Sequence, residues 1–411
     1  MTTPSSASAK PRALLLAVDA PYPVVGGGPL RCASILDYLA QRFSVHLILF
    51  HQPGAPDPAR AIPAGRVEKL DLIALPYHSK RQIPRLIRTA WRLARNRPPL
   101  FDRFSGFEAE VRSLVLGQTY DVAVLEHFWT APYVEQVRSC AKQVVLDLHN
   151  IESAWHSSMA ASERPIPAAG FRRFAKACVP LEQHWLPRMD NVLVTSCDDA
   201  KLVRALAPET GVMVYPNALP EMVLPACVRK HEIVFSGNLE YPPNVGAVRF
   251  FLRRIWPELR TRWPELNWKI VGRYPQAIRT LVSGDPRILV TGPMDDAIPI
   301  LAESQVAVVP LLAGSGTRFK ILEAWAAGTP VVSTRLGAEG LEYRDQEHLL
   351  LADDPRAFAE AVSRLLASPD ERARIGMAGR RLYEERYCWP AAWKELDIVL
   401  GQPSGTSRSA P

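Results

Sequence analysis

The chain has 411 residues, of which 47% are hydrophobic and 22% charged, and it carries a net charge of +7. This length allows two domains with full-sized cores, and the composition excludes an intrinsically disordered protein. The six cysteines are far apart and form no C-x-x-C pair. A reducing, cytoplasmic compartment is therefore expected, rather than a disulfide framework or a zinc site. The positive charge indicates an anionic partner, but no nucleic-acid-binding motif is present.

The N-terminal region places Lys10 and Arg12 before an apolar run, as a signal peptide would. The run covers only 13–18, whereas a signal-peptide core needs roughly 7–15 residues, so we expect a buried first strand. No segment reaches the ~18 apolar residues of a membrane-spanning helix. Both ends of the chain, 1–11 and 401–411, have the composition of disordered tails.

Short apolar runs alternate with amphipathic helical patterns along the rest of the chain. Continuous apolar runs are typical of parallel strands covered on both faces, and their alternation with helices predicts βαβ units. Ten strands in two sets predict an α/β protein with two doubly wound domains. The first set is 13–18, 44–50, 121–126, 143–148 and 191–196, and the second is 231–237, 267–272, 287–292, 305–311 and 329–334.

The boundary between the domains is expected in 214–230, which contains three prolines and no helical period. We therefore predict an N-terminal domain at 12–217, a C-terminal domain at 218–385 and a final helix at 386–400.

The stretch AGSGTRFKILEAWAAGTPVV, 313–332, predicts a ligand site. It reads as a loop after strand 305–311 and a helix that ends at Gly328, so the loop lies at the carboxyl end of a parallel strand. Gly314 and Gly316 let the backbone approach a ligand, and the helix N-terminus attracts anions.

Two cations, Arg318 and Lys320, follow these glycines, and Glu323 lies one turn further into the helix. The cations suit a diphosphate, whereas the carboxylate would accept hydrogen bonds from a ribose. This pattern favours a nucleotide. The alternative is that both cations are solvated and pair with Glu323.

This segment resembles the C-terminal signature of the family 4 glycosyltransferases, and of bacterial exopolysaccharide-type sugar transferases in particular. These enzymes have the GT-B fold of two facing Rossmann-like domains. Five further segments resemble the family in the expected order: 21–40, 146–153, 214–219, 237–275 and 337–366. Three positions depart from its pattern: Ala218 replaces a glycine, Asn238 an arginine and Ser315 the first of two glutamates.

The resemblance implies a retaining transferase that moves a sugar from a nucleotide-diphosphate donor to a glycan or lipid-linked acceptor in cell-surface polysaccharide synthesis. Fixed cations would stabilise the departing diphosphate, so a metal is not required. The chain also has no D-x-D and no H-E-x-x-H pattern, so neither a metal nor another cofactor is expected. The residues implied on the donor side are Arg318 and Lys320 as catalytic groups and Arg273, Gly314, Ser315, Gly316, Thr317 and Glu323 as binding groups.

On the other side of the reaction, the resemblance assigns His149, which follows strand 143–148, to the transferred sugar or the acceptor. A lone histidine in this position can also be structural. The remaining residues implied there are Gly26, Gly27 and Gly28 in the first βα turn, Glu126 and His127 at the end of another strand, and Asn150.

Two other functions remain open at this point. A nucleotide-sugar epimerase shares the fold and needs no acceptor. A non-catalytic nucleotide-sugar-binding subunit would explain Ser315, although the presence of Arg318, Lys320 and Glu323 together argues against it.

A contact with an anionic membrane surface is predicted for 79–97, which contains no acidic residue. Its apolar residues recur at helical spacing and its arginines occupy the other face, a pattern typical of a helix on an anionic membrane surface. An ordinary helix with its apolar face on the core would give the same pattern. The first interpretation implies a cytoplasmic enzyme that is peripheral on the inner face of the membrane.

Overall fold

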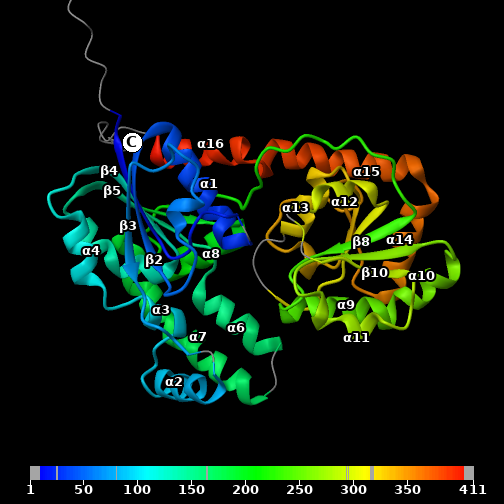
Figure 1. The fold of residues 1–411 in the computed structure, drawn as a ribbon, viewed down its shortest axis with the longest axis horizontal. Coiled ribbons are helices and arrows are strands. Elements are labelled where there is room, and N and C mark those ends of the chain that lie inside the picture. The colour runs from blue at the N-terminus through cyan, green and yellow to red at the C-terminus, as the bar shows by residue number, and fades with distance from the viewer. Residues whose placement is uncertain are drawn as a thin grey trace, which may run out of the picture. The chain divides into compact units, whose positions relative to one another are not determined.

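The computed structural model describes residues 10–24, 26–79, 81–162, 165–292, 294, 296–314 and 319–401. It divides into two units: one holds the chain up to Tyr215 together with the residues from Trp393 onward, and the other holds Pro216–Ala392. Each unit has a parallel sheet with helices packed around it (Figure 1). Most of the predicted disordered tails, 1–11 and 401–411, lies outside the described residues.

The N-terminal unit contains a seven-stranded sheet in the order β3-β2-β1-β4-β5-β6-β7. All its strand pairs are parallel. The topology reverses between β1 and β4, and ligands bind beyond the carboxyl ends of strands at such a point. The strands are β1 Arg12–Ala17, β2 Ser44–His51, β3 Lys69–Ala74, β4 Tyr120–Glu126, β5 Ala141–Asp147, β6 Asn191–Val194 and β7 Val212–Val214.

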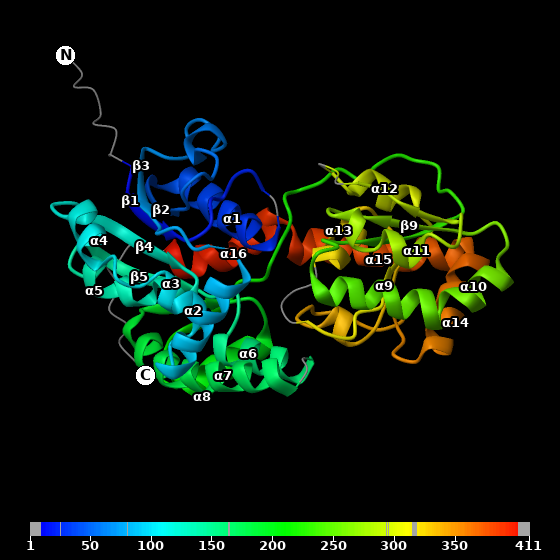
Figure 2. The same ribbon diagram turned by 60° about the horizontal axis from the view of Figure 1, so that its bottom comes forward.

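The helices of this unit cover the sheet, and α2, α6 and α7 lie together beside it (Figures 1 and 2). The last helix, α16, returns to this unit, where the Trp393 indole donates to Ser34 Oγ of α1 at 3.1 Å. The helices are α1 Gly27–Arg42, α2 Gln82–Ala94, α3 Pro99–Arg103, α4 Glu108–Val115, α5 Val134–Val137, α6 Glu152–Ser162, α7 Pro165–Trp185, α8 Cys197–Leu206 and α16 Trp389–Leu400.

The C-terminal unit repeats this topology with six parallel strands in the order β10-β9-β8-β11-β12-β13, which reverses between β8 and β11. Its strands are β8 Glu232–Ser236, β9 Asn267–Val271, β10 Ile288–Val290, β11 Val306–Val309, β12 Val331–Ser333 and β13 Leu350–Leu351. Its helices are α9 Pro242–Arg254, α10 Trp256–Arg262, α11 Arg279–Val282, α12 Ile298–Glu303, α13 Phe319–Ala326, α14 Pro355–Ala367 and α15 Pro369–Leu382.

All ten predicted strands are present, and the prediction of two Rossmann-like domains is confirmed. Three strands were missed: β3, β7 and β13. β3 has several part-exposed and charged positions, whereas β7 and β13 have only three and two residues, so none gives a continuous apolar run. The precise domain limits given above stay predictions. In the part of the chain that the structure describes, every helix is too short or too polar to span a bilayer.

Candidate functional site

Lys320 lies in the first turn of α13, at the carboxyl end of β8. Its Nζ donates to Asn244 Oδ1 at 2.7 Å and lies 5.0 Å from the centre of the Phe235 ring. A Cβ built on Gly237 would lie 3.3 Å from the same Nζ. The ammonium group is thus fixed at the point where the strand order reverses, and an anion bound there would meet a full positive charge.

Two glycines after β8 and β9 bring these loops together. A Cβ on Gly272 would lie 1.8 Å from the Gly237 carbonyl oxygen, so the close approach requires glycine. Gly237 itself has a φ of 156° and would meet Asn244 Nδ2 at 2.8 Å if it carried a Cβ. Both glycines and Asn244 were missed by the sequence analysis. The only local signal was a glycine directly after each of two strands.

Asn238 takes the place of the family's arginine, and its polar groups are used within the turn. Its Oδ1 accepts from the Glu240 N–H at 2.9 Å and its carbonyl accepts from Asn244 Nδ2 at 2.8 Å. Arg273 follows Gly272 and is half-buried, and its side chain has no partner among the residues that the structure describes. A cation is therefore available at the end of β9.

Glu323 is half-buried and accepts a hydrogen bond from Ser236 Oγ at 3.3 Å. Burial raises the pKa of the Glu323 carboxyl, and the Lys320 charge partly offsets this effect. Gly314, with a φ of 108°, is buried. Four predicted donor-side residues, Ser315, Gly316, Thr317 and Arg318, lie outside the described residues, so their roles stay predictions.

A second cluster lies in the N-terminal unit, where β1, β4 and β5 end. His149 follows β5, and its Nε2 lies 3.3 Å from Glu126 Oε1 and 3.3 Å from Asp147 Oδ2. These are ion-pair distances without hydrogen-bond geometry. Both carboxylates are fully buried, and the Val18 N–H donates to Glu126 Oε2 at 3.3 Å. The structure thus brings together His149 and Glu126, which the sequence analysis had placed on separate strands.

Arg31 of α1 holds the Asp147 carboxylate from the other side. Its Nε donates to both carboxylate oxygens, at 2.8 and 3.0 Å, and its Nη2 donates to Oδ1 at 2.5 Å. Its Nη1 donates to the Tyr215 carbonyl at 2.8 Å, at the end of this unit. The sequence analysis missed Arg31 and Asp147, because no local spacing links residues 116 positions apart.

The His127 ring stacks between two aromatic neighbours. It lies 4.3 Å from the Trp129 ring at an angle of 5°, and 3.6 Å from the His149 ring. His127 has a φ of 67°, which is uncommon for a residue other than glycine and is often found at functional sites. Its Nε2 lies 3.9 Å from Asp19 Oδ2 and has no hydrogen-bond partner among the described residues.

Gly27 and Gly28 were predicted in the first βα turn, but both lie in the first turn of α1, and Gly28 reaches this cluster. A Cβ on Gly28 would lie 2.9 Å from Asp19 Oδ2 and 4.0 Å from His127 Nε2, so a side chain there would press on the site. Gly26 has a φ of 100° and caps α1, which begins at Gly27. Asn150 is half-buried, next to His149.

The charges of the cluster follow from its burial and its ion pairs. Burial opposes a charge on His149, but contact with Asp147 and Glu126 overrides this and raises its pKa to about 9. Burial would raise the pKa of Asp147, yet the charges of Arg31 and His149 hold it well below the usual range. Burial and the His149 charge together lower the pKa of His127. At neutral pH the site therefore holds a charged His149 beside a neutral His127.

The same cluster has the donor atoms of a metal site. One ligand atom each from Glu126, His127 and His149 lies within 4.8 Å of the other two. A carboxylate and two imidazoles are ligands that zinc and related ions use. The prediction of a metal-free site therefore stays a prediction.

The fold and the two clusters define a two-domain α/β protein of the GT-B type. Sucrose-phosphate synthase from Thermosynechococcus elongatus matches it with a TM-score of 0.70 at 20% identity, over 95% of this chain and 98% of that one. Anabaena Alr3699/HepE, solved in complex with UDP-glucose, matches with a TM-score of 0.63 at 13% identity, over 95% and 99%.

Residues 230–368 match the family model described as Glycosyl transferases group 1. The chain is 22% identical over 367 residues to an uncharacterized 44.6 kDa protein in the cps region of Klebsiella pneumoniae, over 85% of this chain and 89% of that one. It is 25% identical over 311 residues to D-inositol 3-phosphate glycosyltransferase of Corynebacterium diphtheriae, over 69% and 70%. Residues 230–368 thus form a domain of the group 1 glycosyltransferases, and the resemblance to this type of enzyme is confirmed.

Proposed function

We propose that this glycosyltransferase moves a hexose from a nucleotide-diphosphate sugar, with retention of configuration, to a glycan or lipid-linked acceptor of cell-surface polysaccharide synthesis. The observation that carries the proposal is Lys320, fixed by Asn244 at the topological switch point inside the matched domain. An ammonium in this position stabilises the charge that the diphosphate gains as the glycosidic bond breaks.

The donor side follows from the groups around Lys320. Arg273 supplies a second cation at the neighbouring strand end, and Arg318 is proposed as a third. Glu323 accepts hydrogen bonds from the ribose hydroxyls, next to Ser236. With three cations available, the leaving group needs no metal, and the only co-substrate is the nucleotide sugar.

The acceptor side is proposed at the cluster of the N-terminal unit. The charged His149 donates a hydrogen bond to a hydroxyl of the transferred sugar. The neighbouring carboxylates of Asp147 and Glu126 keep the His149 imidazole protonated. The acceptor hydroxyl attacks the sugar carbon from the face that the diphosphate leaves, and its proton passes to the departing diphosphate oxygen. No pair of catalytic carboxylates is needed for this route, unlike glycoside hydrolysis.

The enzyme is proposed to act at the inner face of the cytoplasmic membrane. None of the 13 residues of α2 is buried, so its apolar face does not pack into the core as an ordinary helix would. The cps-region relative is consistent with a surface polysaccharide as the product.

Thermal-shift screening with UDP-, GDP- and ADP-sugars tests the proposal. A donor at 100 times its dissociation constant stabilises a protein by about 2.7 kcal/mol. The donor found in this way is then incubated with acceptor extracts, and the anomeric configuration of the product is read by NMR. An isomerised sugar formed without acceptor would indicate an epimerase, and donor binding without any product would indicate a binding subunit.

A further inference from the structure

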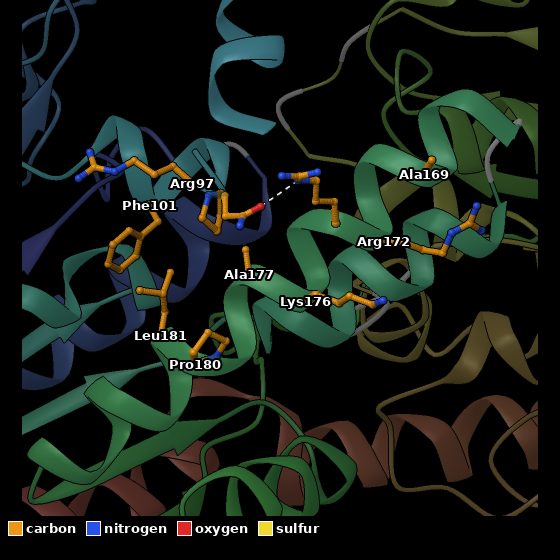
Figure 3. Close-up of a pocket in the computed structure, with 11 residues that line it drawn as sticks. Arg97, Phe101, Ala169, Arg172, Lys176, Ala177, Pro180 and Leu181 are labelled. Carbon is orange, nitrogen blue, oxygen red and sulfur yellow. Dashed lines mark hydrogen bonds between the residues drawn. The ribbon is translucent and has the colours of Figure 1, made fainter. Parts of the chain in front are cut away.

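A groove of about 850 Å³ lies in the N-terminal unit between α7 and the segment that joins α2 to α3. Its apolar side is formed by Phe101 of α3 and by Ala177, Pro180 and Leu181 of α7 (Figure 3). Phe101, Ala177 and Leu181 are only half-buried. The groove therefore offers apolar surface that the protein itself does not cover.

Four cations line the same groove: Arg97, Arg172, Arg173 and Lys176. Arg173 Nε donates to the neutral amide oxygen of Asn96 at 2.8 Å. Arg172 and Lys176 are exposed and have no ion-pair partner in the part of the chain that the structure describes. The groove thus combines an apolar wall with three cations, Arg172, Arg173 and Lys176, that have no carboxylate partner among the described residues.

Among the described residues, Asp102 pairs with Arg97 at 3.5 Å and also with Arg92 of α2 at 2.9 Å. One carboxylate between two guanidinium groups leaves a net positive charge at this end of the groove. The groove therefore favours an anionic ligand both at the segment before α3 and at α7.

The helix α2, which precedes the groove residues Asn96 and Arg97 in the chain, carries an exposed apolar stripe. The side chains of Ile83, Leu86 and Ile87 are 72%, 60% and 65% exposed, and Trp91 is 42% exposed. A Cβ built on Gly170 would lie 3.9 Å from the methyl groups of Leu93, so the end of α2 lies against α7. Exposed isoleucines beside arginines fit the boundary between headgroups and acyl chains.

We propose that this groove binds one anionic phospholipid of the membrane on which α2 lies, with the phosphate at the cationic rim and the first part of an acyl chain against Phe101 and Leu181. The inference goes beyond the proposed transferase reaction, because none of the residues that line the groove belongs to either cluster of the candidate site. A free phosphate would use only the cations, whereas a lipid uses both halves of the groove.

Calorimetric titration of the full chain with dihexanoyl phosphatidylglycerol, below its micelle concentration, tests this proposal. One molecule is expected to bind per chain. Dihexanoyl phosphatidylcholine has the same tails without the net charge, and glycerol 3-phosphate has the phosphate without the tails. Both are expected to bind more weakly, and equal binding of glycerol 3-phosphate would overturn a lipid site.

Variants then locate the site. R172Q/K176Q removes two cations and is expected to weaken binding about 25-fold, at about fivefold per cation. R253Q/R254Q removes two exposed cations from α9 in the other unit and serves as the matched control. A177W fills the groove without changing charge and should also abolish binding.

Equal affinity of R172Q/K176Q and its control, or vesicle binding with no binding of the soluble lipid, would defeat the proposal. Donor thermal shifts on the same samples keep this result distinct from a failure of the transferase assignment.

Discussion

Arg31 and Asp147 form a buried ion pair with three contacts of 2.5 to 3.0 Å, and Asp147 in turn lies 3.3 Å from His149. The guanidinium holds the carboxylate in its charged form, and the carboxylate holds the imidazolium of His149. Because the Arg31 fork also binds the Tyr215 carbonyl, α1 ties the histidine to the residue where the chain leaves this unit. Arg31 is therefore a positioning residue for His149.

R31K tests this relationship, because it keeps the positive charge but loses the planar guanidinium group that donates several hydrogen bonds. We expect turnover to fall with little change in the KM for the donor, whereas breaking the pair with R31A should destabilise the fold by about 3–5 kcal/mol. Urea unfolding and steady-state kinetics separate the two effects. The control is K142A, which breaks the exposed Lys142–Asp121 pair and should cost about 1 kcal/mol or less. A wild-type turnover for R31K would contradict a positioning role.

His149 makes the stability of the protein depend on pH. Its pKa is about 9 in the folded protein and 6.5 as the ordinary value. Below pH 6.5 the imidazole is charged in both states, and its ion pairs stabilise the fold fully. Between pH 6.5 and 9 the folded state keeps a proton that the unfolded chain loses, so stability falls as pH rises, by at most about 1.4 kcal/mol per pH unit. In H149N this part of the slope should disappear. Parallel stability curves for the two proteins over this range would show that folding does not raise the pKa of His149.

The sequence predicted this region only in part. Runs such as 143–148 identify the strands, and the edge where parallel strands end is a known place for ligands, so His149, Glu126 and His127 could be named. Arg31 and Asp147 could not, because their pairing depends on how α1 packs on the sheet. Gly237, Gly272 and Asn244 were missed for a similar reason: their importance appears only when the loops after β8 and β9 approach each other.

Lys320 is expected to act on the leaving group. K320A should lower turnover by roughly 10²–10³, as for the loss of one charge-stabilising donor, and R318A should have an effect of similar size. The fold should persist, because the Lys320 side chain is half-buried beside the polar Asn244 rather than part of the apolar core. Thermal unfolding and turnover are measured together, with K201A on the exposed surface of α8 as the control. Near-wild-type turnover in both K320A and R318A would show that the diphosphate does not bind at these residues.

Chelation tests whether the reaction is free of metal. We expect EDTA to leave activity largely intact, because Lys320, Arg273 and the proposed Arg318 can neutralise the diphosphate. The alternative is a reaction that needs a metal ion bound by Glu126, His127 and His149, whose ligand atoms lie close together. Loss of activity that zinc or manganese restores, together with failure of the restoration in H127A, would assign a metal to this cluster and overturn the metal-free mechanism.

The exposed face of α2 is expected to attach the protein to anionic membranes. I83S/I87S removes two side chains that are 72% and 65% exposed, so the free energy of unfolding should change by about 0.5 kcal/mol or less. Co-sedimentation with phosphatidylglycerol vesicles should nevertheless weaken strongly, because burial of each large side chain contributes about 1.5–3 kcal/mol. Binding of the wild type should also weaken at high salt, since the arginines of α2 act through screened charge. L202S, on the exposed surface of α8, is the matched control. Vesicle binding that is absent at low salt, or equal in I83S/I87S and L202S, would leave α2 without a membrane role.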